Sequence, residues 1–205
     1  MINYADYVDA DELAAINDRA QKHALELAER TIPERFKDDS FSTFRVKERG
    51  DEKALKTAKD FCADINAKKT TALIISGDVG TGKTHLACAI LKEVGGRYVL
   101  SAKIESDFNA SKAFGAEETF DAVVKKYSGV PLLVIDEVGR ESNAKDAQFS
   151  LYQIVNERYN RHLPTVLIAN FERAELVRYV GIATIDRLTE GLRTITLTGR
   201  SKRGM

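Results

Sequence analysis

The sequence has no tryptophan, only three prolines and two cysteines, and no excess of either charge over its 205 residues. Cys62 and Cys88 lack metal-ligand spacing and fall in separate expected helices, so we expect buried free thiols in a reducing compartment. No signal peptide is recognisable, and no apolar run approaches the ~18 residues of a membrane-spanning helix. These absences favour a cytoplasmic protein without a membrane partner. The balanced charge leaves any nucleic-acid contact to a local patch.

The length and the 43% hydrophobic content suit one α/β core. Short apolar runs alternate with amphipathic patterns, which predicts a doubly wound parallel sheet with helices on both faces. We expect strands near residues 72–75, 97–101, 130–135, 164–169 and 192–197, and helices near residues 11–30, 51–68, 84–94, 104–114, 117–127, 145–159, 174–180 and 182–188. Pro33 ends the first helix, so we divide the chain into a helical extension, residues 1–32, and a domain of residues 33–205.

Residues 77–84 read GDVGTGKT, a complete G-x-x-x-x-G-K-[ST] phosphate loop between an expected buried strand and a helix. Its glycines let backbone N–H groups face phosphate oxygens, and the helix adds its positive N-terminal dipole. Lys83 is expected to reach the β- and γ-phosphates and Thr84 to reach Mg²⁺. His85 has the pattern of a packed or partly exposed helix residue, although it adjoins the loop. The expected nucleotide-binding residues here are Gly77, Asp78, Val79, Gly80, Thr81, Gly82, Lys83, Thr84 and His85.

Polar residues follow two further apolar strands, where the carboxyl ends of a parallel sheet form its ligand-binding edge. Asp136 is expected to hold Mg²⁺ through water together with Thr84, and Glu137 to accept a proton from water attacking the γ-phosphate. Alternatively, Asp136 and Glu137 only mark the point where the strand leaves the sheet and enters a polar loop. Asn170 either orients that water and senses the γ-phosphate or simply ends its strand.

Arg187 follows Asp186 in a short expected helix. An arginine next to an aspartate in a short helix is usually a surface residue that forms a salt bridge with it. The alternative is an arginine finger that places positive charge on the γ-phosphate of a neighbouring subunit.

Several segments, in this order and spacing, resemble the DnaC/IstB family of AAA+ ATPases: GDVGTGKTHLACAI, PLLVIDEVG, LYQIVNERYNRHLPTVLIAN, ATIDRL and LTGRSKR. The segment TIPERFKDDSFSTF also looks like the approach to their ATPase domain. The resemblance covers roughly residues 31–203 and is far more specific than a phosphate loop alone.

The resemblance implies an AAA+ core with a five-stranded parallel sheet in the order 5-1-4-3-2 and no separate lid domain. It also implies an Mg²⁺-dependent ATPase with ATP bound between adjacent subunits. Carried over residue by residue, Lys83 and Thr84 belong to Walker A, Asp136 and Glu137 to Walker B, Asn170 is sensor 1 and Arg187 the trans-acting finger. Arg203 matches sensor 2, although the ending Ser201-Lys202-Arg203 departs from the family's Ser-Tyr-Arg and Arg200 lies close by.

The resemblance further implies a helicase loader that self-associates through ATP, binds a replicative hexameric helicase and helps to load it onto single-stranded DNA. Residues 11–30 then bind the helicase or, alternatively, pack on the chain's own ATPase domain. Lysines and interleaved aromatic residues between the second and third expected strands are candidates for contact with DNA. Alternatively, the lysines form a solvated face and the aromatic residues belong to the core. These residues are Lys103, Lys112, Lys125, Lys126, Phe108, Phe114 and Tyr127.

Three other functions remain open. A transposition helper of the same fold would engage duplex DNA and a transposase, and a nucleotide-gated adaptor would bind partners with little turnover. The intact Asp136-Glu137 pair disfavours an inactive ATPase. A phosphoryl-transferring kinase is weaker, because no acceptor-binding segment is visible. A compact loader would suit a phage or prophage replication module, which is an association and not a physical argument.

Overall fold

A computed structural model describes residues 9–67, 69, 72–171 and 173–202. At its centre lies a five-stranded sheet in the order β2-β3-β4-β1-β5, which is 5-1-4-3-2 from the other edge, as predicted. All neighbouring strands pair in parallel. The strands are β1 (Ala72–Gly77), β2 (Arg97–Leu100), β3 (Leu133–Val138), β4 (Thr165–Ala169) and β5 (Leu192–Leu197).

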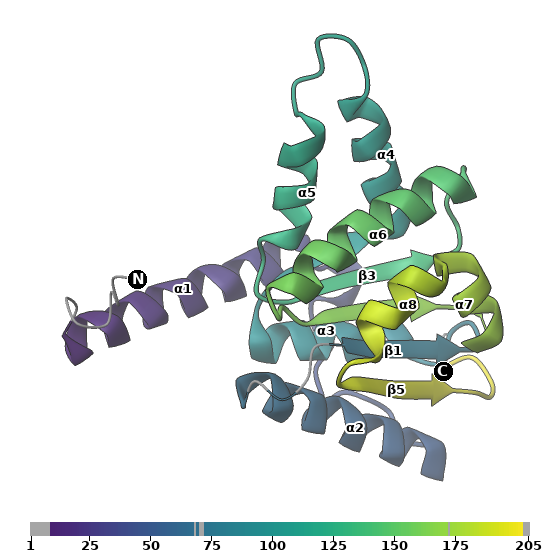
Figure 1. Cartoon of the computed structure of the whole chain (residues 1–205). Coiled ribbons are helices and arrows are strands. Elements are labelled where there is room, and N and C mark those ends of the chain that lie inside the picture. Colours follow the sequence, from purple (N-terminus) through teal and green to yellow (C-terminus); the bar gives the residue numbers. More distant parts are fainter. Residues whose placement is uncertain (1–8, 68, 70–71, 172, 203–205) are drawn as a thin grey trace.

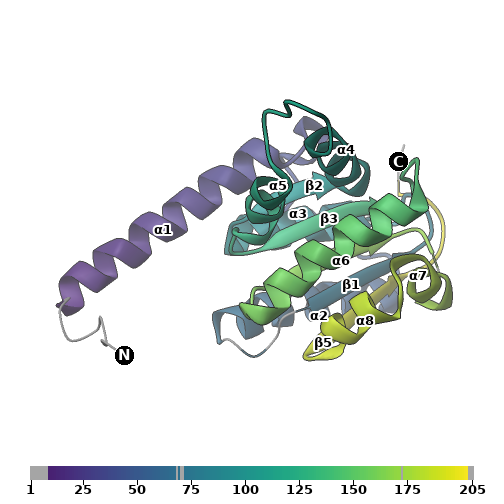
Figure 2. The ribbon, with the colours of Figure 1, turned by 45° about the horizontal axis from the view of Figure 1, so that its top comes forward.

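Helices cover both faces of the sheet (Figures 1 and 2). Strand residues alternate between two cores: Leu73 and Ile75 pack on one side with α1–α3, whereas Ala72 and Ile74 pack on the other with α4–α8. Burial on both faces explains why the strands are continuous apolar runs. The α-helices are α1 (Ala10–Thr31), α2 (Arg49–Asn66), α3 (Lys83–Val94), α4 (Ser101–Ser111), α5 (Phe120–Ser128), α6 (Ala144–Asn160), α7 (Arg173–Val180) and α8 (Ile182–Thr189), with a 3₁₀ turn, Glu34–Phe36.

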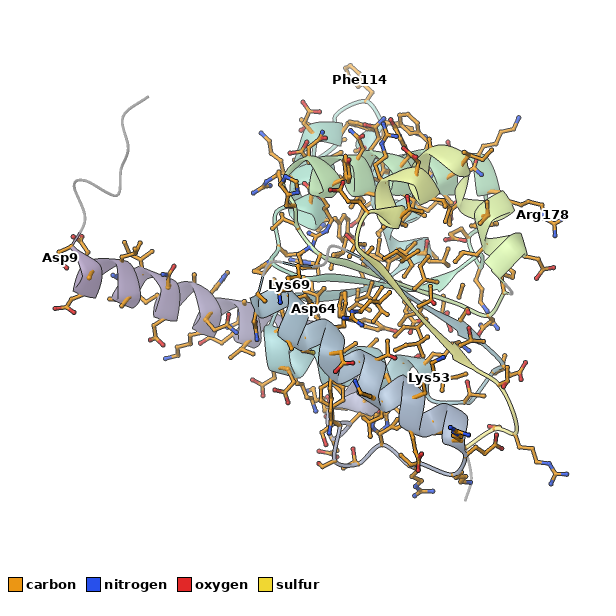
Figure 3. The ribbon with its side chains drawn as sticks, turned by 60° about the horizontal axis from the view of Figure 1, so that its bottom comes forward. Asp9, Lys53, Asp64, Lys69, Phe114 and Arg178 are labelled. Carbon is orange, nitrogen blue, oxygen red and sulfur yellow. The ribbon has the colours of Figure 1, made fainter. Side chains whose placement is uncertain are left out.

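The first helix divides into a packed half and a projecting half. Toward its C-terminal end Ala24 and Ala28 are buried, and the Ala24 carbonyl accepts a 2.9 Å hydrogen bond from the Gly96 N–H. The other half extends away from the body, with Asp9 at its far end (Figures 1 and 3). There Leu13 and Ile16 are 49% and 44% exposed. Packing on the chain's own domain therefore holds for the inner half of this helix, whereas Leu13 and Ile16 of the outer half are exposed.

Helices α4 and α5 form a hairpin that stands out from the body, with Phe114 at its tip (Figures 1 and 3). Phe108 and Tyr127 are buried and therefore belong to the core, which removes them as base-stacking candidates. Phe114 is fully exposed. Helix α5 begins at Phe120 and not near residue 117, because the Thr119 hydroxyl caps it by accepting the Ala122 N–H at 3.2 Å.

Arg158 of α6 joins the amino ends of the sheet and is fully buried. Its guanidinium donates hydrogen bonds to backbone carbonyls and to one hydroxyl, which lie at the end of α5, just before β3 and at the start of β4. The acceptors lie at 2.5 to 3.3 Å and are Thr165 Oγ1 and the carbonyl oxygens of Tyr127, Ser128, Val130, Pro131 and Pro164. Burial lowers the pKa of Arg158 to about 9, so the group remains charged at neutral pH.

The remaining structural expectations concern the cysteines, the membrane and the lid. Cys62 and Cys88 are buried free thiols, as predicted, and burial raises the pKa of each to about 12. Within the part of the chain that the structure describes, no helix combines the length and the apolar content needed to cross a bilayer. After β5, residues 198–202 return to the phosphate loop, where the Lys202 N–H donates to the Gly80 carbonyl at 2.8 Å. The absence of a separate lid domain stays a prediction.

Candidate functional site

A cavity of about 420 Å³ opens at the carboxyl ends of β1, β3 and β4. Its size is typical of small-molecule sites. It gathers most of the predicted site residues: Val79, Gly80, Gly82, Lys83, Thr84, His85, Asp136, Glu137 and Asn170. It also includes residues that the sequence did not single out: Arg35, Phe36, Asp39, Arg45, Arg140 and Lys202.

The phosphate loop curls around the N-terminus of α3. Gly82 precedes this helix with a φ of 103°, and a Cβ on it would lie 2.9 Å from the Phe44 ring, so this position requires glycine. Lys83 is 6% exposed, and its Nζ donates to the carbonyls of Gly77 and Asp78 at 2.8 and 2.6 Å. Thr81 is buried and also donates to Asp78, at 2.8 Å. The loop therefore presents the positive helix end and a lysine to one point, as a phosphate requires.

Asp136 is buried at the cavity floor and accepts three hydrogen bonds. Its Oδ2 accepts from the Thr84 hydroxyl at 2.8 Å and from the Tyr98 phenol at 2.7 Å, and its Oδ1 accepts from the Glu137 N–H at 2.6 Å. The sequence did not identify Tyr98 as a site residue. Its only signal in the sequence is a phenol hydroxyl on the strand β2, which lies next to β3 in the sheet. Burial, and then the neighbouring Asp136 carboxylate, raises the pKa of Tyr98 far above its usual range, so the phenol remains a donor.

Glu137 occupies a bulge in β3, where the pairing with β4 shifts between Ile135 and Val138. Its φ of 56° is uncommon for a residue with a side chain. Glu137 is exposed and lines the cavity, whereas its two neighbours are buried. Such local strain clusters at functional sites, which makes Glu137 a candidate for a chemical role.

Asn170 and Arg187 lie in different places. Asn170 follows β4 directly and lines the cavity. Arg187 is absent from the described lining of that cavity. Its Nε donates to Asn156 Oδ1 and its Nη1 to Asp186 Oδ2, both at 3.1 Å. Its guanidinium also lies 5.7 Å from the centre of the Tyr152 ring. The predicted pairing with Asp186 is thus present.

The end of the chain contributes Lys202, which sequence reasoning passed over in favour of Arg203. Arg203 falls outside the described residues. The Lys202 ammonium pairs with Asp51 at 2.6 Å and lies 4.5 Å from the centre of the Phe44 ring. This contact holds the tail over the phosphate loop.

His85 fastens the approach segment onto α3. Its Nδ1 lies 3.1 Å from the Asp39 carboxylate, its Nε2 lies 2.8 Å from the Ser40 carbonyl oxygen, and its ring meets the edge of Phe44 at 5.3 Å. The expectation of a packed helix residue is confirmed. These contacts also bring Arg35, Phe36 and Arg45 to the cavity wall, far from the loop in sequence.

The donor set of the cavity fits Mg²⁺. Thr84 and Asp136 offer a hydroxyl and a carboxylate 2.8 Å apart, and such hard oxygens suit this cation. Among residues 9–67, 69, 72–171 and 173–202, no group of three or more His, Cys, Asp and Glu side chains could form a metal cage. Mg²⁺ usually binds one or two protein groups and takes its other ligands from phosphates and water, so two donors beside a phosphate loop suffice.

Comparisons with known proteins agree with this geometry. The family described as "IstB-like ATP binding protein" matches residues 1–204. The replicative helicase loader DnaC of Escherichia coli K12 is 32% identical over 156 residues, which are 74% of this chain and 63% of that protein. DnaC of Buchnera aphidicola subsp. Schizaphis graminum is 28% identical over 183 residues, or 84% and 72% of the two chains. The chain thus spans less than two thirds of the E. coli relative.

Solved structures share the fold. The crystal structure of the DnaC helicase loader superposes with a TM-score of 0.70 and 23% identity, over 80% of this chain and 99% of that chain. DnaI gives a TM-score of 0.66 and 25% identity, over 83% and 94% of the two chains. The replication initiator DnaA, bound to AMPPCP and single-stranded DNA, gives 0.66 and 20%, over 82% and 51%. The resemblance found in the motifs is confirmed, and the chain belongs to the family of IstB-like ATP-binding proteins.

Proposed function

We propose that this protein is an ATP-dependent helicase loader. It binds ATP and Mg²⁺, hydrolyses the ATP, and engages a replicative hexameric helicase during loading onto single-stranded DNA. The observation that carries the ATPase assignment is the convergence of Lys83, Thr84, Asp136, Glu137 and Asn170 on one cavity. The helicase assignment is supported by the similarity to DnaC, of which the chain spans 63%. Cytoplasmic location belongs to the same proposal.

Each predicted catalytic or metal-binding residue has a chemical task in this proposal. The loop N–H groups and Lys83 bind the phosphates, and Thr84 and Asp136 hold Mg²⁺, which neutralises charge that develops on the phosphates. Glu137 accepts the proton of the attacking water, and Asn170 orients that water. Arg203 is the proposed sensor 2, and Arg187 stabilises the γ-phosphate of an adjacent subunit. The position of Arg187 outside the described lining of its own chain's cavity is compatible with this trans role and, with it, self-association through ATP.

Two projecting elements are the proposed contacts with other macromolecules. The outer half of α1 offers Leu13 and Ile16 to the helicase, within the extension of residues 1–32 that precedes the proposed ATPase domain of residues 33–205. The tip of the α4–α5 hairpin offers Phe114 to single-stranded DNA, because an exposed aromatic ring can stack on any base. Lys103 and Lys126 are weaker DNA candidates, since both pair with Asp107.

The ATPase assignment is tested by Glu137→Gln. Loss of a general base lowers turnover by about 10²- to 10⁴-fold, while the phosphate contacts and thus the ATP affinity remain. Phosphate release and binding of a fluorescent ATP analogue measure the two quantities. Glu117→Gln, an exposed carboxylate outside the described cavity, is the matched control and is expected to leave both unchanged. Unchanged turnover in Glu137→Gln would remove this residue from its role.

The partner assignment is tested by retention of the purified replicative helicase of the same host on immobilised protein. Deleting all of α1 would expose the core around Ala24 and Ala28, so we choose the double substitution Leu13→Gln and Ile16→Gln. Loss of two exposed apolar contacts is expected to weaken retention at least about tenfold, with no change in thermal stability. Lys22→Gln, exposed on the same helix, is the control.

The same assay separates the alternatives. Retention of a transposase together with duplex DNA, and not of the helicase, would favour the transposition helper. Helicase retention without measurable ATP turnover by the wild-type protein would favour the nucleotide-gated adaptor. Equal retention by the double variant and the wild type would move the helicase contact away from α1.

A further inference from the structure

Two side chains donate hydrogen bonds to the same oxygen of Asp136, and only one of them belongs to the phosphate loop. Thr84 donates from the loop, at 2.8 Å. Tyr98 donates from β2, the edge strand beside β3, at 2.7 Å. Both residues of the Tyr98–Asp136 pair are buried, with exposures of 7% and 4%. Solvent therefore has little access to replace the phenol as a donor.

The two donors differ in what they do when a nucleotide binds. The Thr84 hydroxyl is itself a proposed metal ligand, so its own bonding changes when it turns to the cation. The Tyr98 phenol has no such second task. Together with the Glu137 N–H, which donates to the other carboxylate oxygen, it fixes Asp136 from two strands of the sheet. An anionic ligand held in this way loses less orientational freedom when a cation arrives.

The backbone of Tyr98 is fixed as well. As a residue of an edge strand it has an N–H that points away from β3, and this N–H donates to Thr31 Oγ1 at the end of α1, at 3.0 Å. The ring packs in the core that α1, α2 and α3 share with the sheet. The phenol oxygen is thus attached to a rigid support from which it can hold a carboxylate.

We propose that Tyr98 is a positioning residue for the magnesium–nucleotide site, in which its phenol holds the Asp136 carboxylate in the orientation that binds the cation. This rests on the proposed function, in which Asp136 and Thr84 hold Mg²⁺. The proposal predicts that removing the phenol oxygen of Tyr98 lowers the affinity for Mg²⁺ and leaves the affinity of the loop for the phosphates unchanged.

The test is Tyr98→Phe, measured by titrating Mg²⁺ at a fixed concentration of a fluorescent, non-hydrolysable ATP analogue. Loss of a ligand's supporting hydrogen bond typically costs 10- to 100-fold in metal affinity, so the midpoint is expected to move about 10- to 100-fold higher. Affinity for the analogue in EDTA is expected to stay unchanged, since Lys83 and the loop are intact.

The chain offers a closely matched control in Tyr127→Phe. Tyr127 is also buried and also donates to a carboxylate, Asp107, at 2.6 Å, but this hydrogen bond joins α5 to α4, outside the described cavity. Both variants lose a buried phenol–carboxylate hydrogen bond, so thermal unfolding is expected to show similar losses. Only Tyr98→Phe is expected to shift the Mg²⁺ midpoint.

The outcomes are distinct. An unshifted midpoint in Tyr98→Phe, or an equal shift in both variants, would overturn the positioning role and leave the proposed function standing. Wild-type protein whose affinity for the analogue is indifferent to Mg²⁺ would overturn the proposed function and the positioning role together. An equal loss of affinity in EDTA would show that Tyr98 supports the loop and not the cation site.

Discussion

The two ends of the sheet each bury a cation, and the two cations are used differently. At the amino end Arg158 is fully buried, and acceptors from the approaches to β3 and β4 surround its guanidinium. At the carboxyl end Lys83 is 6% exposed, and its ammonium bonds to carbonyls of the loop that would receive a phosphate. A guanidinium has five N–H groups, and those of Arg158 donate to backbone carbonyls and to the Thr165 hydroxyl, so this charge serves the fold.

The contrast shows how to separate a structural charge from one that meets a ligand. Arg158 contacts α5 and the approaches to β3 and β4, whereas the described cavity lies at the opposite, carboxyl end of the sheet. Lys83 lies on that cavity beside Asp136 and Glu137. Burial alone would rank the two alike. The neighbours separate them, because a group that meets a ligand has to reach a space large enough to hold one.

The largest expected effect is on stability, from Arg158→Met. The change removes the charge and leaves several buried carbonyls without a donor, so the free energy of unfolding is expected to fall by about 3–5 kcal/mol. Urea denaturation measures it. Thr165→Val, which removes only the hydroxyl acceptor, is the milder control, with an expected loss of about 1–2 kcal/mol. A smaller loss of unfolding free energy in Arg158→Met than in Thr165→Val would contradict the role of Arg158 in stabilising the amino end of the sheet.

A smaller and different effect is expected from Lys83→Ala. Affinity for ATP is expected to fall at least about 100-fold, equivalent to about 2.7 kcal/mol, because the phosphates lose their buried cation. Stability without nucleotide is expected to change by less than about 1 kcal/mol, since the carbonyls that lose the ammonium belong to half-buried Gly77 and exposed Asp78, where water can replace it. Calorimetric titration and the rise in melting temperature with ATP measure the two quantities. A stability loss as large as that of Arg158→Met would erase the distinction between the two ends.

The sequence predicted the features that local patterns encode. The runs that became β1, β3 and β4 are continuous and apolar because both faces are covered, and the polar residues that follow them meet at one edge because the strands are parallel. Asp136, Glu137 and Asn170 were predicted on this basis, and the structure places all three on the cavity with Lys83.

What escaped prediction depends on contacts between distant segments. Tyr98 bonds a carboxylate 38 residues away, and all but one of the acceptors of Arg158 are backbone carbonyls, so neither residue leaves a local pattern. Helix periodicity predicted the apolar face of α1 through Leu13 and Ile16, but it cannot say where along the helix the packing stops. The core ends near Ala24, and the same stripe continues into solvent.

The shape of α1 has a mechanical consequence. A continuous helix rises 1.5 Å per residue, so the stretch from residue 10 to residue 20 forms a stiff lever of roughly 16 Å. The inner half of the helix packs on the body through Ala24 and Ala28, and its Thr31 hydroxyl accepts a hydrogen bond from the Tyr98 N–H of β2. A partner bound to the outer half would be held at a set distance from the sheet, at the end of a helix that is hydrogen-bonded through Thr31 to the strand whose Tyr98 phenol donates to Asp136.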